Sequence, residues 1–311
     1  MSRWHAPIAF AEEGGSGHYL PGSIASFIDG VPATETFLTR LNVVNYDGSI
    51  DGNARVAIGG LTTLGADAKS WGDGLTILWR PPIELGENWS YAMSTTIPVV
   101  TMDVSANVLV GAPGGGTASV KRGDTQSGLG DIVLIPLLLN YNVDPDFNMN
   151  FRVTAYAPTG YYEVGRLANT GKNFWSVEPT LALMYLGQKN GREASLFMGA
   201  SFNEENPDTN YKSGTQVHLD GTLAQHFPAF GGLAGVGVSA YYYQQVTGDS
   251  GSGATLGDFK GKSVGVGPVV SYTSKIASRD VVAEFKWLHE TETENRLTGD
   301  ILWLKVVFKF Y

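Results

Sequence analysis

The 311-residue sequence lacks cysteine, is poor in charged residues and contains no long hydrophobic run. The absence of cysteine excludes disulfide bonds and thiolate metal sites. The absence of about 18 consecutive apolar residues excludes a transmembrane helix. Charged residues make up 16% of the chain, against about 25% in a typical soluble domain. The formal net charge of −9 argues against nucleic acid as a partner, because phosphates attract clustered lysine and arginine.

Glycine and aromatic residues are abundant instead, with 40 glycines, 14 tyrosines, 14 phenylalanines and 7 tryptophans. Apolar and polar residues alternate along much of the chain, which predicts β-strands. In residues 173–186, Trp175, Leu181 and Tyr185 share one face and Glu178 lies on the other. An aliphatic band between two aromatic residues is the expected layout of a strand that faces lipid.

About twelve strands are predicted, joined alternately by short turns and longer loops. This alternation is typical of an outer-membrane barrel. The strands are predicted at residues 36–47, 74–85, 88–107, 128–141, 147–158, 173–186, 193–203, 211–226, 230–246, 259–273, 280–291 and 299–311. The longer loops are predicted at residues 48–73, 108–127, 159–172, 204–210, 247–258 and 292–298.

The predicted fold class is therefore all-β, a closed antiparallel transmembrane β-barrel with short periplasmic turns and longer extracellular loops. Residues 1–35 form an N-terminal segment and residues 36–311 form the barrel. An even number of strands places both ends of the chain on the periplasmic side.

The last predicted strand, "ILWLKVVFKFY", has Leu304, Phe308 and Phe310 on one face and Lys305 and Lys309 on the other. We expect it to pair with the first strand, because unpaired backbone groups in lipid cost several kcal/mol each. A closing strand that ends on an aromatic residue also predicts the barrel-assembly machinery as a partner. A soluble β-sandwich is the alternative, but it would need polar residues at positions such as Trp175, Phe285 and Phe308.

The face opposite the lipid-facing one is predicted to line the lumen. It carries charges of both signs, which suit small hydrophilic solutes, and aromatic rings, which can stack on a flat apolar solute. His218 and Asp220 are two residues apart on this face and are expected to form a hydrogen-bonded pair. The predicted lumen-lining residues are Arg40, Arg80, Glu84, Arg152, Tyr156, Glu178, His218, Asp220, Tyr241, Tyr243, Glu284, Lys286, Trp303, Lys305 and Lys309.

Several prolines fall inside or at the ends of predicted strands. Proline cannot donate a backbone hydrogen bond to a neighbouring strand, so each one predicts a kink or bulge in the wall. Such kinks either adjust the curvature of the barrel or open the wall sideways to lipid. The predicted wall kinks are Pro81, Pro82, Pro98, Pro136, Pro158, Pro179 and Pro268.

Four segments, "GGSGHYLPG" (14–22), "NFWSVEPTLAL" (173–183), "YKSGTQVHLDG" (211–221) and "VGVGP" (264–268), carry a resemblance to a known family. They resemble the SphA-like, phenol-degradation meta-pathway family of Gram-negative outer-membrane channels. The likeness extends over most of the chain. It implies a monomeric channel that takes up hydrophobic and often aromatic compounds, and it brings no catalytic residue with it.

The sequence does not decide where the N-terminal segment lies or where the mature protein begins. Ala9-Phe10-Ala11 resembles a signal-peptide cleavage site, which predicts a mature start near Glu12. Residues 12–35 are rich in glycine, serine and proline. We expect them either to fold into the lumen as a partial plug or to form a periplasmic tail.

The expected function is passive uptake of small hydrophobic molecules, aromatic ones included, through the outer membrane of a Gram-negative bacterium, with sideways exit at proline kinks. A general pore for hydrophilic solutes and a lipid-modifying enzyme that uses His289 are the alternatives. We expect no catalytic residue, metal or cofactor. Outer-membrane lipid and lipopolysaccharide are expected partners. The acidic loops 203–208 and 289–295 are either solvated loops or sites for the divalent cations that bridge lipopolysaccharide.

Overall fold

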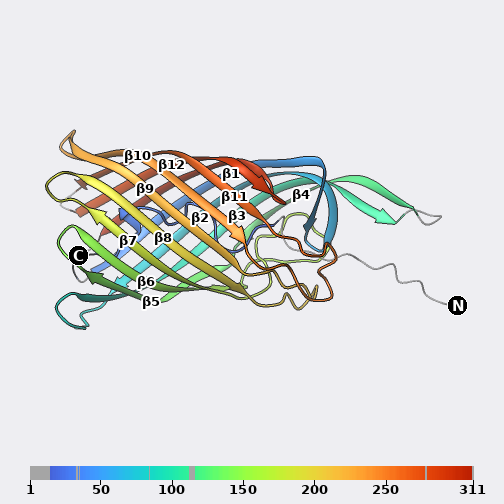
Figure 1. Ribbon diagram of the computed structural model, residues 1–311, viewed down its shortest axis with the longest axis horizontal. Coiled ribbons are helices and arrows are strands. Elements are labelled where there is room, and N and C mark those ends of the chain that lie inside the picture. Colours follow the sequence, from blue (N-terminus) through green and yellow to red (C-terminus); the bar gives the residue numbers. More distant parts are fainter. Residues whose placement is uncertain are drawn as a thin grey trace.

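The computed structural model describes residues 15–32, 34, 36–83, 85–111, 116–276 and 279–309. These residues form thirteen strands that run along one cylinder (Figure 1). A short 3₁₀ helix, η1 (Phe27–Asp29), precedes them. The strands are β1 (Thr36–Ile58), β2 (Leu61–Arg80), β3 (Trp89–Gly111), β4 (Thr117–Leu129), β5 (Ile132–Asn142), β6 (Phe147–Ala157), β7 (Ser176–Leu186), β8 (Arg192–Asn203), β9 (Gln216–Ala229), β10 (Gly232–Gln245), β11 (Lys262–Ile276), β12 (Arg279–Glu294) and β13 (Thr298–Lys309). In this described part of the chain, no helix has the length and apolar character needed to cross a membrane.

The cylinder is closed, and its strand pairs are antiparallel. The first and last strands pair from Leu38 with Lys309 to Ser49 with Thr298. Strands β4 and β5 do not pair with each other. They share one position beside β3, which pairs with β5 near its start and with β4 towards its end. The thirteen strands thus occupy twelve positions, and the prediction of a closed antiparallel barrel of about twelve strands is confirmed.

The outer wall is apolar and aromatic, as a lipid-facing surface requires. Trp175, Phe285 and Phe308 are 43%, 43% and 42% exposed. A soluble sandwich would place such residues in water, so this alternative is wrong. Phe310 and Tyr311, the residues expected to signal to the assembly machinery, lie outside the described residues, as does the expected mature start near Glu12.

Two of the predicted long loops are strands. Residues 48–73 extend the β1–β2 hairpin as far as the pair Ile58–Leu61, and residues 108–111 and 117–127 extend the paired strands β3 and β4 (Figure 1). On the outer face of this extension Lys69 pairs with Asp47 at 2.9 Å, and both side chains are exposed. These strands project beyond the lipid, so their outer face can carry charges. They therefore lack the alternating apolar residues by which a strand is predicted, and the sequence indicates loops instead.

Two loops pack inside the extended hairpins. Leu167 and Ala168, from the β6–β7 connection, and Phe259, from the β10–β11 connection, share a buried cluster with Val56 and Val108. The β6–β7 connection also covers β4, since Arg166 Nε donates to Asp124 Oδ2 at 2.9 Å. This contact covers a strand that pairs along only one edge. The mouth of the barrel is therefore lined by packed loops.

Candidate functional site

The N-terminal residues 15–32 and 34, here called the plug, run through the barrel. We call the end of the barrel with the longer connections the loop end and the opposite end, with the short turns, the turn end. At the loop end the plug lies close to the β12–β13 connection, since a Cβ on Gly15 would lie 2.5 Å from the carbonyl oxygen of Asn295. At the turn end, the plug leads into β1. Its most buried residues are Tyr19, Ala25, Ser26 and Asp29. The sequence allows this segment to be either a plug in the lumen or a periplasmic tail, and in the structure the described residues lie in the lumen.

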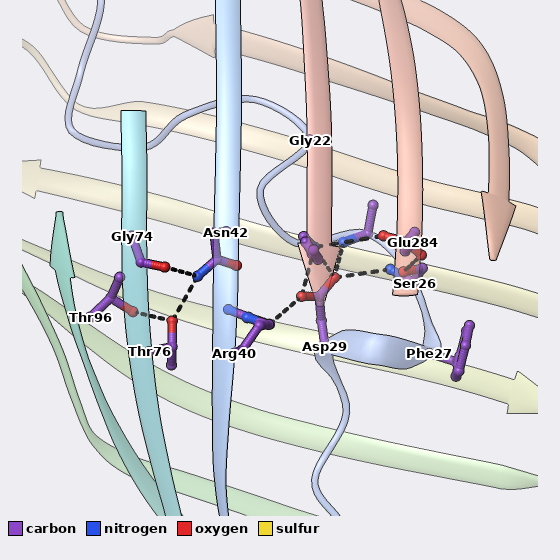
Figure 2. A network of polar contacts seen from close by, with 12 residues as sticks. Gly22, Ser26, Phe27, Asp29, Arg40, Asn42, Gly74, Thr76, Thr96 and Glu284 are labelled. Atoms are coloured by element: carbon purple, nitrogen blue, oxygen red, sulfur yellow. Dashed lines mark hydrogen bonds and ion pairs between the residues drawn. The ribbon is translucent and has the colours of Figure 1, made fainter. Parts of the chain in front are cut away.

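A cluster of charges holds the turn end of the plug (Figure 2). Lys305 Nζ donates to both carboxylate oxygens of Asp29 at 2.8 Å. Arg40 Nη1 donates to Asp29 Oδ1 at 2.8 Å. We call Asp29, Arg40 and Lys305 the Asp29 latch. Its cations come from β1 and β13, so the latch bridges the plug to the two strands that close the barrel.

Three further side chains of the wall reach the plug near the latch. Arg152 Nη2 donates to the backbone oxygen of Asp29 at 2.8 Å. Lys286 Nζ donates to the Gly22 carbonyl at 3.1 Å and lies 3.2 Å from Glu284 Oε1. Glu284 in turn accepts a hydrogen bond from the Ser26 hydroxyl (Figure 2). Most charges predicted on the inner face of this region therefore contact the plug.

The local sequence places Asp29 for this role. Its Oδ2 accepts hydrogen bonds from the backbone N–H groups of Ala25 and Ser26, at 3.0 and 3.4 Å, which closes the turn around η1. Burial by itself raises the pKa of Asp29, but the nearby Lys305 and Arg40 outweigh it, so the pKa lies below its usual value. The carboxylate is therefore charged. Removing it would leave the buried Lys305 only Glu284, 3.8 Å away, as a countercharge, and breaking a buried ion pair typically costs about 3–5 kcal/mol.

The loop end of the plug is held by a histidine. One ring nitrogen of His18 lies 2.7 Å from Ser176 Oγ and the other 2.9 Å from Asp131 Oδ2. The ring stacks on Tyr156 with centroids 5.1 Å apart. Burial lowers the pKa of His18, and the hydrogen bond with Asp131 opposes this effect only in part. We therefore assign the ring a neutral state near pH 7, in contrast to the charged latch.

The middle of the plug is bound mainly through its backbone. The Gly17 N–H donates to the Tyr243 hydroxyl at 3.1 Å, and the Gly22 N–H donates to Asp220 Oδ1 at 3.0 Å. Trp303 Nε1 donates to the Pro21 carbonyl at 3.1 Å. Side chains predicted to face a solute thus satisfy the polar groups of the plug.

The structure buries most of the predicted lumen-lining residues. His218 Nδ1 lies 2.7 Å from Asp220 Oδ2, as their spacing predicts. Glu84 falls outside the described residues. The three partly buried residues of the set are Arg40, Arg80 and Lys309. The buried residues are Arg152, Tyr156, Glu178, His218, Asp220, Tyr241, Tyr243, Glu284, Lys286, Trp303 and Lys305.

The predicted proline kinks divide into two groups. Pro81, Pro82 and Pro158 lie just beyond strand ends, so they terminate strands and do not kink the wall. Pro98 marks the place where the partner of β3 changes from β5 to β4. At Pro136 the register shifts against both neighbouring strands, β3 and β6.

At Pro179 and Pro268 the pairing with one neighbour is interrupted. The β7–β8 pairs stop at Val177 and resume at Thr180, and the β11–β12 pairs stop at Val266 and resume at Val269. At the second break the backbones stay close, since a Cβ on Gly267 would lie 1.8 Å from the Trp287 carbonyl oxygen.

The break at Pro179 coincides with a pocket of about 460 Å³ in the wall. Outer-face residues such as Phe151 and Leu219 line it together with the inward-facing His218. A Cβ on Gly199 would lie 2.0 Å from His218 Nε2, so the glycine brings the imidazole against the backbone of β8. This pocket reaches from the lipid-facing surface to a side chain that contacts the plug, because Tyr19 stacks on His218.

Sequence reasoning did not identify the plug residues that bind the wall, His18, Tyr19, Ser26 and Asp29. One signal was available, because Ser26 and Asp29 have the spacing of a helix-capping box. The partners of the plug, by contrast, come from strands far away in the sequence. A local pattern contains no information about such contacts.

The remaining expectations concern chemistry. His289 is exposed and its Nδ1 lies 3.0 Å from Asp300 Oδ1. Among the described residues, no group of three or more histidine, aspartate or glutamate side chains is arranged to hold a metal ion. The acidic loops therefore offer no preformed cation site within the part of the chain that the structure describes.

The closed barrel, its apolar outer wall and its plugged lumen define a β-barrel of the outer-membrane channel class. Residues 51–306 match the family described as "Putative MetA-pathway of phenol degradation", and the chain belongs to this family. The resemblance inferred from the sequence is thereby confirmed. No curated protein matches the sequence.

Solved structures support the same fold. An outer membrane channel from Pseudomonas putida F1 is 16% identical, with a TM-score of 0.64, and the alignment covers 94% of this chain and 100% of that one. The β domain of the Bordetella autotransporter BrkA is 10% identical with a TM-score of 0.45, over 88% of this chain and 100% of that one. A Pseudomonas aeruginosa FadL homologue is 11% identical with a TM-score of 0.39, over 89% of each chain. The last two TM-scores are below 0.5, so neither bears on function.

Proposed function

We propose that this protein is a passive channel for small hydrophobic, in particular aromatic, molecules in the outer membrane of a Gram-negative bacterium. The wall pocket at Pro179 is the observation that carries the proposal. The plug fills the lumen beside this pocket, so a solute that enters from the loop end and displaces part of the plug meets an apolar way out through the wall. The family's description, which names phenol degradation, supports an aromatic solute.

The sideways route follows from two properties of the wall. Pro179 lacks the N–H group that would pair with β8, so opening the wall at this place breaks fewer hydrogen bonds than elsewhere. The pocket is lined mainly by apolar side chains. An apolar solute therefore passes into lipid without crossing the periplasmic water, where its free energy is higher.

Uptake by whole cells tests this proposal, because an intact lipopolysaccharide leaflet slows apolar solutes that pure lipid vesicles let through. Ala200→Phe places a ring in the wall pocket, and Ala194→Phe places one on the outer face of the same strand, outside that pocket. We expect the first variant to lower the uptake rate of a radiolabelled aromatic compound at least about fivefold and the second to leave it unchanged. Equal uptake by both variants would refute the sideways exit.

A general pore for hydrophilic solutes is the second candidate, and the charged inner face favours it. Buried cations and carboxylates such as Arg152, Lys286 and Glu284 would interact well with water once the plug had left. Vesicle swelling in sugar solutions separates the two candidates. Rapid sugar entry through the wild-type protein, without a gain in aromatic uptake by cells, would favour the hydrophilic pore.

A further inference from the structure

One ring of the plug occupies a slot built from aromatic residues of the wall. Tyr19 is 3% exposed, and its ring stacks on His218 with centroids 3.6 Å apart and an angle of 11° between the planes. Tyr241, Tyr243 and Trp303 belong to the same buried cluster as Tyr19. A flat ring is thus enclosed by flat partners, which is the arrangement that selects aromatic groups.

The polar end of this slot fits Tyr19 poorly. Within the described residues, the buried Tyr19 hydroxyl has no hydrogen-bond partner, although buried tyrosine hydroxyls usually have one. Burial raises the pKa of Tyr19 and the neighbouring carboxylate of Asp220 raises it further, so the two groups lie close together, although their contact falls short of good hydrogen-bond geometry.

A second polar atom beside the slot has only a long contact. His218 Nε2 forms no hydrogen bond of good geometry in the described structure, and its ion-pair contact with Glu178 Oε1 is 3.4 Å long. The other ring nitrogen is bound to Asp220. The Tyr19 hydroxyl is therefore the unpaired atom of the slot, and an unpaired buried polar group costs free energy.

The groups around the slot become available when the plug moves. The Tyr243 hydroxyl binds the Gly17 N–H, Asp220 Oδ1 binds the Gly22 N–H, and Trp303 Nε1 binds the Pro21 carbonyl. All three plug residues lie within three positions of Tyr19. Withdrawal of this short stretch therefore exposes an aromatic slot together with hydrogen-bond donors and acceptors at its edge.

We propose that this slot is a binding site for a monocyclic phenol, which Tyr19 occupies as an internal substitute. A free phenol has the ring and hydroxyl of Tyr19 without its backbone, so it can stack on His218 and also approach Asp220. The inference rests on the proposed function for its biological sense, and it names the class of solute and the residues that recognise it. Because His218 also lines the wall pocket, the slot lies beside the proposed exit.

Calorimetry on detergent-purified Tyr19→Ala protein tests the site with phenol, benzene and cyclohexanol as probes. Benzene keeps the ring without the hydroxyl, and cyclohexanol keeps the hydroxyl without the aromatic face. We expect phenol to bind at least about fivefold more tightly than either, since a site that pairs with a hydroxyl discriminates against compounds that lack it. Adding His218→Ala should abolish the advantage of phenol over cyclohexanol. Equal binding of all three probes would show a mere cavity and overturn the proposal.

Phe27→Ala is the matched control, because Phe27 is also a plug residue whose ring packs on a histidine, His226, with centroids 5.0 Å apart. We expect this variant to show no preference for phenol, and a preference equal to that of Tyr19→Ala would overturn the assignment of the slot.

The wild-type protein provides a second measurement if Tyr19→Ala does not fold. Excess phenol should accelerate amide hydrogen exchange in residues 17–22 and leave exchange in residues 26–30 unchanged. Cyclohexanol should leave exchange unchanged in both segments. Unchanged exchange in residues 17–22 would contradict the proposal. Both measurements test binding to purified protein and do not depend on transport. If cells take up aromatic solutes through the channel but neither measurement shows binding at Tyr19, the proposed function stands and only the binding site is refuted.

Discussion

The two ends of the plug are held by different kinds of interaction. The turn end carries Asp29, whose charge is matched by Lys305 and Arg40. The loop end carries His18 and Tyr19, which stack on wall rings. His18 also contacts the Asp131 carboxylate at 2.9 Å, and Lys172 donates to the Ser16 carbonyl, but no charged side chain of the described plug is paired there. A buried charge tolerates no loss of its partner, whereas ring contacts weaken gradually. The comparison indicates a plug that is anchored at the turn end and can loosen at the loop end, the side from which we propose that solutes enter.

The largest expected effect comes from breaking the anchored end. Asp29→Asn removes the carboxylate that Lys305 and Arg40 share and leaves the buried Lys305 only the more distant Glu284, 3.8 Å away, as a countercharge. Breaking a buried ion pair typically costs about 3–5 kcal/mol. We expect the plug to leave its seat, so that openings in planar-bilayer recordings become at least about tenfold more frequent than in the wild type. The control is Asp47→Asn, which removes one partner of the exposed pair with Lys69 and should change little. Unchanged recordings for Asp29→Asn would show that the latch does not hold the plug.

A smaller effect is expected where the plug passes the middle of the barrel. Gly22 has φ +77, and a Cβ there would lie 2.4 Å from Leu288 Cδ1. Gly22→Ala therefore adds backbone strain of about 1–2 kcal/mol and a contact that forces Leu288 to shift. We expect a lower melting temperature together with more frequent openings.

Gly231→Ala separates these two contributions. Gly231 has the same φ of +77, but nothing lies within 4 Å of its added Cβ, and it belongs to the β9–β10 turn. It should lower the melting temperature through strain alone and leave the recordings unchanged. If both variants open the channel equally, the effect of Gly22→Ala does not arise from the plug.

The smallest expected effect is a difference in pH response between the two ends. The pKa of His18 is lowered by burial, against the opposing influence of Asp131 and with a contribution from Lys172. Its stabilising contribution is therefore present above the unfolded pKa of about 6.5 and is lost as the pH falls. The pKa of Asp29 is lowered too, so its contribution is present above about 3.9 and is lost only in stronger acid.

Amide hydrogen exchange in detergent, corrected for the intrinsic effect of pH, measures this difference. Between pH 7.5 and pH 5, protection of residues 16–20 should fall while that of residues 26–30 persists. His18→Gln, which cannot take up a proton in this range, should remove the pH dependence at the loop end. Loss of protection at the turn end first would reverse the comparison.

Local alternation predicts the membrane-embedded wall well. Successive residues of a strand face lipid and the packed lumen in turn, so apolar and polar side chains alternate. The exposed Trp175, Phe285 and Phe308 therefore identify the outer face. The same method fails for residues 48–73 and 108–127, because beyond the lipid both faces of a strand tolerate polar residues. It also places Pro81, Pro82 and Pro158 in the wall, although the strands end just before them.

The candidate site was predictable only in part. Alternation identifies Lys305 and Glu284 as inward-facing, but it does not show that Lys305 binds Asp29, 276 positions away. Likewise, Pro179 predicts an interruption of pairing, whereas the pocket depends on Gly199 and His218 from other strands. Such contacts arise from the closure of the barrel around the plug.

By itself, the sequence determined the barrel, its lipid-facing surface and the polarity of its inner face, because these follow from a two-residue period that each strand carries locally. Only the tertiary structure decided that residues 15–32 and 34 enter the lumen, which wall charges anchor them and where the wall is weak. The physical reason is that a buried ion pair or a stacked ring depends on groups brought together by closure, and its free energy does not exist in any single segment.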